Sequence, residues 1–164
     1  LCMKYIRLLF TIVIFNQSIL GDSFNFNTYN NHGSLGLINI PTARFYDEGS
    51  FGFTLYNGNP DQKMTLTSSP YDWLEASLFY TNIDNNPQGC NFNTCYKDKG
   101  FNFKIRLKEE GKFPAVAIGL NDIGGTGLYN SEFIVASYGI NKLDMHFGLG
   151  WGNLNNKSKF KNPL

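Results

Sequence analysis

Few residues in this sequence have the types and spacing that catalysis needs. His32 and His146 are the two histidines, and a hydrolase would need a nucleophile beside one of them. His146 lies between Asp144 and Gly148 in an alternating segment, so a serine on a neighbouring strand is conceivable, but no pattern identifies one. Glu75 and Asp144 are conceivable as a carboxylate pair for glycoside cleavage. We expect no enzymatic activity, and we expect His146 to form hydrogen bonds in a polar interior.

A glycine-rich stretch invites comparison with a phosphate-binding loop. It runs through "DIGGTG" and is marked by Asp122, Gly124, Gly125 and Gly127. No helical pattern follows it, and no lysine stands at the position that a phosphate loop requires. We therefore predict a loop that uses glycine for positive φ angles, with no cofactor and no metal.

The N-terminal residues predict export. In residues 1–23, two basic residues precede the apolar run Leu8–Phe15, and small and polar residues follow it, which is the order of a signal peptide. That run is too short to cross a bilayer as a helix. The alternative is a buried first strand or helix. Cys2 does not follow the apolar run, so the sequence predicts no lipid anchor.

Export affects the interpretation of the two remaining cysteines. Cys90 and Cys95 lie in the polar stretch "NNPQGCNFNTCYKD". In an oxidising compartment such a pair is most simply a disulfide, and free thiols are the alternative. Two ligands are too few for a structural zinc site.

Residues 99–108, "KGFNFKIRLK", show the alternation of apolar and polar residues that determines on which face of a strand each polar side chain lies. Apolar and polar residues alternate there, so a β-strand would place them on opposite faces. Similar runs occupy residues 50–57, 62–68, 73–81, 114–121, 131–139 and 142–152, with a weaker one at 34–40. Charged residues make up only 16% of the chain and aromatic residues another 16%. The sequence therefore predicts an all-β antiparallel meander of about seven or eight strands.

Such strands suit either a soluble sandwich or a membrane barrel. Strands of about ten residues, aromatic residues near strand ends and alternating long and short loops favour an outer-membrane β-barrel. We expect residues 24–33 to be a flexible lead-in and residues 34–164 to belong to the barrel domain. The side chains predicted to face the barrel interior are Glu75, Lys104, Arg106, Lys108, Asp144 and His146. Those predicted to face lipid are Phe101, Phe103, Ile105, Leu107, Leu143, Met145, Phe147, Leu149 and Trp151.

The cationic row formed by Lys104, Arg106 and Lys108 has two interpretations. It could line a path for an acidic polysaccharide, or it could form ion pairs with Glu75, Glu132 or Asp144, which we favour. The net charge of +1 gives no basis for predicting nucleic-acid binding.

Three stretches resemble the YjbH family, which is often labelled as exopolysaccharide biosynthesis protein. They are "GLINIPTARFYDEGSFGFTL", "PYDWLEASLFYT" and the long block from "DKGFNFKIRLK" to "HFGLGWG". The resemblance covers about residues 36–152, with the three blocks in order. Family members are several times longer, so the resemblance implies that residues 34–164 are the N-terminal part of a β-barrel domain. They are often described as lipoproteins, whereas this chain lacks a lipid-attachment cysteine.

The resemblance implies a non-enzymatic outer-membrane protein of a Gram-negative bacterium that serves production or export of extracellular polysaccharide. Outer-membrane lipid, extracellular polysaccharide and other secretion components would be its partners. Seven or eight strands are followed by a polar tail without a closing strand, and a strand edge cannot stay open in lipid. Closure needs either a missing C-terminal part, which we favour, or all eight strands in a small barrel. The alternative is a secreted soluble β-sandwich that binds glycans.

Overall fold

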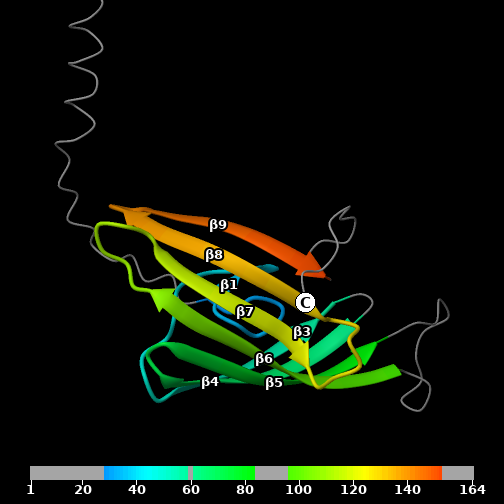
Figure 1. Ribbon diagram of the computed structural model, residues 1–164. Coiled ribbons are helices and arrows are strands. Elements are labelled where there is room, and N and C mark those ends of the chain that lie inside the picture. The colour runs from blue at the N-terminus through cyan, green and yellow to red at the C-terminus, as the bar shows by residue number, and fades with distance from the viewer. Residues whose placement is uncertain (1–27, 59–60, 84–95, 153–164) are drawn as a thin grey trace, which may run out of the picture.

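The computed structural model describes residues 28–58, 61–83 and 96–152. Every regular element in these residues is a β-strand. Seven strands form one sheet: β3 (Ser50–Asn57), β4 (Asp61–Tyr71), β5 (Leu74–Ile83), β6 (Tyr96–Lys108), β7 (Ala115–Ile123), β8 (Ser131–Ile140) and β9 (Leu143–Gly152). Two further strands of two residues each, β1 (Gly36–Leu37) and β2 (Ile40–Pro41), form a small separate hairpin (Figure 1). No helix in the described part of the chain is long and apolar enough to cross a membrane.

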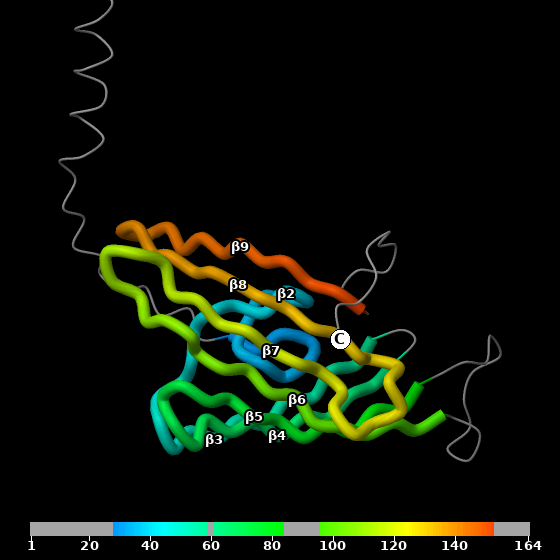
Figure 2. The backbone as a smooth tube through the Cα atoms, viewed as in Figure 1, coloured from blue at the N-terminus to red at the C-terminus, as the bar shows by residue number. Residues whose placement is uncertain are grey.

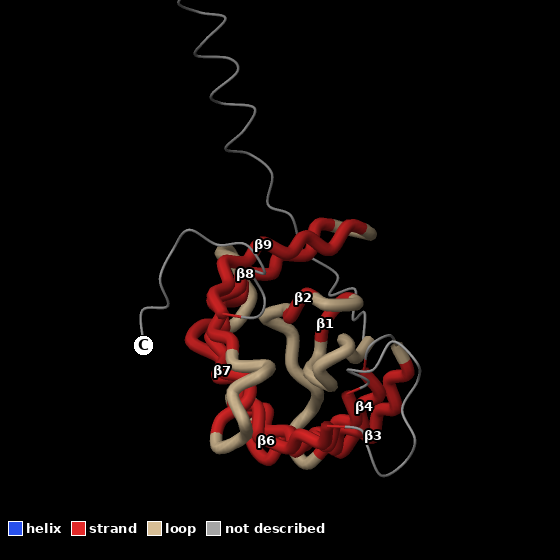
Figure 3. Tube along the Cα trace, turned by 90° about the vertical axis from the view of Figure 1, so that its right-hand side faces the viewer, coloured by secondary structure: helices blue, strands red, loops and turns tan. Residues whose placement is uncertain are grey.

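The seven-stranded sheet is an antiparallel meander in which every strand pairs with the next one in sequence. Viewed along the strands, the sheet curls into an arc, as Figure 3 shows. Register shifts occur in β4 between Ser68 and Tyr71, and twice between β6 and β7. Such irregularities increase local twist and help a sheet to curve. The predicted all-β meander is therefore confirmed, and its shape is that of a half-barrel.

The two faces of this half-barrel have the reverse of the usual polarity. On the convex face, large apolar side chains are exposed, with Phe53 of β3 at 62% and Phe147 of β9 at 72%. On the concave face, charged and hydroxyl side chains are buried, including Lys104 and Thr65 at 1% each. Soluble proteins bury apolar surface because its removal from water is favourable. This sheet instead directs its apolar face outward over all seven strands.

The space inside the arc is filled by the N-terminal segment, residues 28–49. In Figure 2 this segment lies behind β6 and β7, and in Figure 3 it lies inside the arc of strands. Its Leu35 side chain is fully buried. A small apolar core joins the segment to β7 and β8 and consists of Ala43, Phe45, Ala115, Ala117, Phe133 and Val135. We call residues 28–49 the inner segment.

The inner segment differs from what the sequence suggested for this region. Residues 34–40, the weakly predicted eighth strand, contain β1 and the start of β2, and they do not join the seven-stranded sheet. Residues 28–33 fall within the predicted flexible lead-in, yet Asn30 is only 4% exposed and bonds to Ser34. The alternation in "SLGLINI" covers only seven residues and suggested a strand of the main sheet. The structure of this stretch depends instead on its contacts with the concave face, which the sequence pattern does not show.

The two ends of the half-barrel carry different connections. Asp72–Trp73, residues 109–114 and Asn141–Lys142 join strands at one end, which we call the tight-turn end. The connection 124–130 lies at the other end, together with the strand ends Asn57, Asp61, Ile83 and Tyr96, and we call it the long-loop end. The Asn141 φ of 54° fits the two-residue turn between β8 and β9, because asparagine tolerates the left-handed region.

Candidate functional site

Two polar clusters occupy the concave face, and the first lies at its centre. Glu75 of β5 and Lys104 of β6 are directly opposite in the sheet register, and Lys104 Nζ lies 3.2 Å from Glu75 Oε2. Both side chains are 2% exposed. The Glu75 carboxylate accepts the Leu35 N–H at 3.2 Å, and Lys104 Nζ donates to the Leu35 carbonyl at 3.3 Å and the Arg44 carbonyl at 2.9 Å. The buried ion pair therefore holds the backbone of the inner segment on both sides of Leu35.

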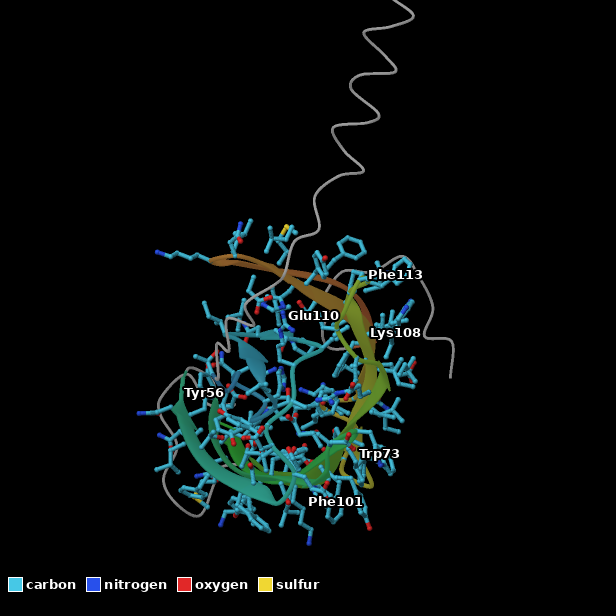
Figure 4. The ribbon with its side chains drawn as sticks, turned by 90° about the vertical axis from the view of Figure 1, so that its left-hand side faces the viewer. Tyr56, Trp73, Phe101, Lys108, Glu110 and Phe113 are labelled. Atoms are coloured by element: carbon cyan, nitrogen blue, oxygen red, sulfur yellow. The ribbon has the colours of Figure 1, made fainter. Side chains whose placement is uncertain are left out.

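Arg44 extends the first cluster to the tight-turn end. Its Nη2 lies 2.6 Å from Asp144 Oδ1, its Nε donates to Asp144 Oδ2 at 3.3 Å, and its Nη1 forms an ion pair with Glu110. Glu110 Oε1 also accepts the Gly139 N–H at 2.8 Å. Figure 4 shows Glu110 on the inner side of the sheet, whereas Lys108 and Phe113 lie on the outer side. Arg44 therefore ties the inner segment to β9 and to the β6–β7 connection.

Ser137, His146 and Asp144 form an arrangement that resembles a catalytic triad. Ser137 and His146 are register partners in β8 and β9, with Ser137 Oγ 2.8 Å from His146 Nδ1, and His146 Nε2 lies 3.4 Å from Asp144 Oδ2. Sequence reasoning allowed for such a serine but could not find it, because only the strand register brings it beside His146.

The surroundings of these three residues favour a structural role. Ser137 is 1% exposed and its Oγ accepts the Ala43 N–H at 2.9 Å, so the inner segment covers the hydroxyl. Asp144 is already paired with Arg44. A nucleophile must reach a substrate carbonyl or phosphoryl group, and this hydroxyl has no open approach. The contacts instead anchor Ala43 and Arg44.

The second polar cluster lies at the long-loop end, around the glycine-rich loop. Asp122 Oδ2 accepts the Tyr129 N–H at 3.0 Å, and Asp98 Oδ1 accepts the Thr126 N–H at 3.3 Å. The Tyr129 hydroxyl donates to Asp61 Oδ2 at 2.6 Å, and Lys63 Nζ lies 3.7 Å from the centre of the Tyr129 ring. These carboxylates therefore fix the course of the loop between β7 and β8.

His32 of the inner segment faces this second cluster across a cavity of about 610 Å³. Tyr129 meets the His32 ring edge-on at 6.5 Å between ring centres, and Asn102 Nδ2 donates to the His32 carbonyl at 3.2 Å. Burial, together with the Lys63 ammonium, lowers the pKa of His32 to about 4, and Asp61 opposes this shift. His32 is therefore neutral at physiological pH.

The glycine-rich loop has the geometry expected from its sequence. Gly124 and Gly127 have φ angles of 72° and 79°, and Asp122 has a φ of 60°. The positive φ angles predicted for the glycines of this loop are confirmed at Gly124 and Gly127, whereas Gly125 does not have a positive φ. Among the described residues, no group of three or more His, Cys, Asp or Glu side chains is arranged to hold a metal ion.

The residues predicted to face the interior divide into two groups. Glu75 and Lys104 are buried on the concave face, and the Asp144 and His146 side chains are 8% and 9% exposed there. Arg106 is half-buried, with its guanidinium 4.6 Å from the Phe45 ring centre and bonded to Glu109 at 3.0 Å. Lys108 is exposed at the strand end, with Nζ 4.2 Å from the Phe113 ring centre. The predicted cationic row is therefore not a continuous open surface.

The residues predicted to face lipid lie on the convex face. Most of them are exposed, whereas Phe103 and Trp151 are half-buried.

The ion pairing favoured for the cationic row is confirmed for Lys104 with Glu75. Cys90 and Cys95, with their predicted disulfide, lie outside the described residues, as does the predicted signal peptide.

Sequence reasoning missed Arg44, Glu110, Asp98 and Asp61 as members of these clusters. Arg44 and Glu110 stand in connecting segments without periodicity, so no pattern indicates which face they approach. Asp98 precedes the clear alternation of β6, although it lies in register with that pattern, six residues before Lys104. Extending the period-two pattern to the N-terminal side would have placed Asp98 on the polar face.

Known proteins share sequence with most of this chain. The family model described as "Exopolysaccharide biosynthesis protein YbjH" matches residues 28–164. A curated relative from Escherichia coli (strain K12), described as "Uncharacterized lipoprotein YjbH", is 37% identical over 137 residues. That match covers 80% of this chain but spans only 20% of the relative's length. No solved structure gives a significant match. The chain belongs to the YjbH family.

Proposed function

We propose that these strands form part of the wall of an outer-membrane β-barrel that serves production or export of extracellular polysaccharide. The observation that carries the proposal is the reversed polarity of the sheet. Phe101 is 49% exposed on the convex face of β6, whereas Lys104 on the concave face is 1% exposed. An apolar exterior and a polar interior are what a β-sheet needs when hydrocarbon surrounds it.

Strand length and aromatic placement support the same proposal. The seven strands of the sheet have between 8 and 13 residues, close to what a tilted strand needs to cross a bilayer. Tyr71 and Trp73 stack at the tight-turn end with ring centres 5.5 Å apart, and both are about half exposed. Tyr80 and Tyr96 are exposed nearer the long-loop end. Aromatic side chains at both ends match the interfacial belts of membrane barrels.

The polysaccharide link rests on the family description and on the relative's position in the same family. The description of the relative as a lipoprotein supports an exported, membrane-associated protein. This chain spans about one fifth of that relative, so the activity of the whole protein is part of the proposal. Ion pairing of Lys104 and cover by the inner segment favour a supporting wall here over a polymer-conducting surface.

We further propose that this part of the protein is not enzymatic. The triad-like set, Ser137, His146 and Asp144, is used to anchor the inner segment, and the Ser137 hydroxyl is covered. A soluble glycan-binding sandwich receives less support, because a sandwich packs two sheets through apolar inner faces. The described strands form a seven-stranded sheet and a two-stranded hairpin, and the inner face of the sheet is mostly polar, with an apolar patch on β7 and β8.

Membrane fractionation of the complete protein in a Gram-negative host tests the proposal. We expect a band in the outer-membrane fraction whose gel mobility changes on boiling, and loss of secreted polysaccharide when the gene is deleted. A soluble periplasmic protein without a mobility change would overturn the barrel. A heat-modifiable membrane protein whose deletion leaves polysaccharide secretion unchanged would overturn the polysaccharide role alone.

A further inference from the structure

Buried oxygen atoms without hydrogen-bond partners gather at the long-loop end of the concave face. Asp98 Oδ2, Asp122 Oδ1 and Thr81 Oγ1 are buried and have no partner within the described part of the protein. Their residues are 1%, 4% and 0% exposed. A buried polar atom without a partner is costly, and a carboxylate oxygen is more costly than a hydroxyl. Three such atoms in one region therefore need a physical explanation.

The sheet register brings these atoms together. Thr81 of β5 is directly opposite Asp98 of β6, and both side chains lie on the concave face. Directly opposite residues in an antiparallel pair have Cβ atoms about 4.5–5.5 Å apart. Asp122 reaches the same region beside Gly100, where an added Cβ would lie 2.6 Å from Asp122 Oδ1. Gly100 is two residues after Asp98 on the same face of β6.

A backbone carbonyl adds a further oxygen atom. A Cβ at Gly125 would overlap Asp122 Oδ1 and would lie 2.6 Å from the Lys99 carbonyl oxygen. Gly125 therefore permits a close approach between the loop, the Asp122 carboxylate and the start of β6. The second oxygens of the two carboxylates are already used, because Asp98 Oδ1 accepts Thr126 N–H and Asp122 Oδ2 accepts Tyr129 N–H. These two hydrogen bonds fix both carboxylate groups against the loop, so their unused oxygens are also held in place.

The charge in this region is not balanced by protein groups. On the concave side of the sheet, Asp61, Asp98 and Asp122 contribute three carboxylates and Lys63 contributes one ammonium, whereas Lys97 and Lys99 are exposed on either side of Asp98 in β6. Lys63 Nζ lies over the rings of Tyr129 and Phe79 at 3.7 and 5.2 Å from their centres. It makes no ion pair within 4.0 Å among the described residues. One divalent cation would balance the remaining charge.

We propose that Asp98, Asp122 and Thr81 bind a calcium ion between β5, β6 and the β7–β8 loop. Calcium accepts carboxylate, hydroxyl and carbonyl oxygens in flexible arrangements and completes its coordination with water. Two carboxylates with neutral oxygens fit a weak site, with a dissociation constant of about 10⁻⁴ to 10⁻³ M, as in extracellular modules. The ion would fix the glycine-rich loop to the sheet.

Terbium luminescence provides the test, because Tb³⁺ is an oxygen-seeking substitute for Ca²⁺ that neighbouring tyrosine rings sensitise. The full chain, folded in detergent and stripped with EGTA, is titrated with Tb³⁺ under tyrosine excitation, and Ca²⁺ is then added as competitor. Tyr129 is placed to sensitise the ion, because its N–H is bonded to Asp122. We expect a saturable signal that millimolar Ca²⁺ displaces, and Ca²⁺ should raise the unfolding temperature of the protein.

Two variants and one control give the test its specificity. Thr81→Val removes a hydroxyl without a protein partner, so we expect unchanged or higher stability in EGTA and about tenfold weaker Ca²⁺ competition. Asp98→Asn should weaken competition further, because it removes a charge. Asp72→Asn, in the exposed β4–β5 turn, should leave the signal unchanged. Absence of a Ca²⁺-displaceable signal, or equal competition in wild type, Thr81→Val and Asp98→Asn, would overturn the proposal.

Discussion

Lys104 Nζ lies 3.2 Å from Glu75 Oε2 in the middle of the concave face, and the two side chains are 2% exposed. The same two groups bind the N–H and the carbonyl of Leu35. A single buried ion pair thus links two adjacent strands to a segment that lies far earlier in the chain. This arrangement gives the charged residues of β5 and β6 a role in holding the inner segment inside the half-barrel.

The first prediction concerns this ion pair. Lys104→Met leaves the Glu75 carboxylate buried without its counterion, so we expect a loss of about 3–5 kcal/mol in the free energy of unfolding. Urea unfolding of the detergent-folded protein, followed by tryptophan fluorescence, measures the change. The double variant Lys104→Met with Glu75→Leu should recover part of the loss. Lys112→Met, at an exposed turn position, is the control, and an equal effect there would contradict the prediction.

The second prediction concerns Arg44, which contacts both Asp144 and Glu110. Arg44→Met removes charged hydrogen bonds worth about 1.5–3 kcal/mol each, so the inner segment should open more often. Hydrogen exchange followed by mass spectrometry should show faster exchange of the Thr42 and Ala43 amides, which are hydrogen-bonded to Leu35 and Ser137. Lys142→Met in the exposed β8–β9 turn should leave their exchange unchanged. Unaltered exchange in Arg44→Met would contradict the prediction, because the apolar core and the contacts of Glu75, Lys104 and Ser137 would then hold the segment without the Arg44 side chain.

The third prediction is a pH dependence that comes from His32. Its pKa is lowered from 6.5 to about 4 in the folded state, so between these values the unfolded state binds a proton that the folded state does not. Stability therefore falls as the pH decreases from about 6.5 to about 4, by an amount on the order of 3 kcal/mol at most. The groups facing the ring are Lys63, Asp61 and Tyr129.

Urea unfolding of wild type and His32→Asn at neutral pH and near the lowered pKa of about 4 measures this contribution. Carboxylates titrate in the same range in both proteins, so the difference between the two proteins isolates His32. We expect His32→Asn to lose less stability on acidification than wild type. An equal loss in the two proteins would mean that the His32 ring titrates normally.

The fourth prediction tests whether lipid contacts the convex face. Phe101→Lys places a charge in the middle of β6, where insertion into a bilayer should cost about 2–4 kcal/mol. Phe113→Lys changes another exposed phenylalanine, which lies in the β6–β7 connection, outside the strands (Figure 4). We expect Phe101→Lys to reduce the heat-modifiable, membrane-inserted form and Phe113→Lys to leave it unchanged. If both variants insert as well as wild type, the convex face does not lie in hydrocarbon.

The strands and their two faces were predictable from the sequence alone. Period-two alternation indicates which side chain lies on which face, because the backbone of a β-strand alternates its side chains whatever surrounds it. For this reason the pattern of residues 99–108 is enough to assign Phe101 and Lys104 to opposite faces. The positive φ angles of Gly124 and Gly127 were predictable for a similar reason, since they follow from local conformational freedom.

What fills the concave face depends on tertiary contacts. The inner segment has only a short, weak alternation at residues 34–40. Its position depends on Arg44, Leu35 and Ala43 meeting groups that are between 40 and 100 residues away in sequence. The pairing of Ser137 with His146 likewise depends on strand register. The grouping of Asp98, Asp122 and Thr81 depends on the same register and on the course of the β7–β8 loop. Contacts of this kind depend on distances in space, and no local pattern in the sequence encodes those distances.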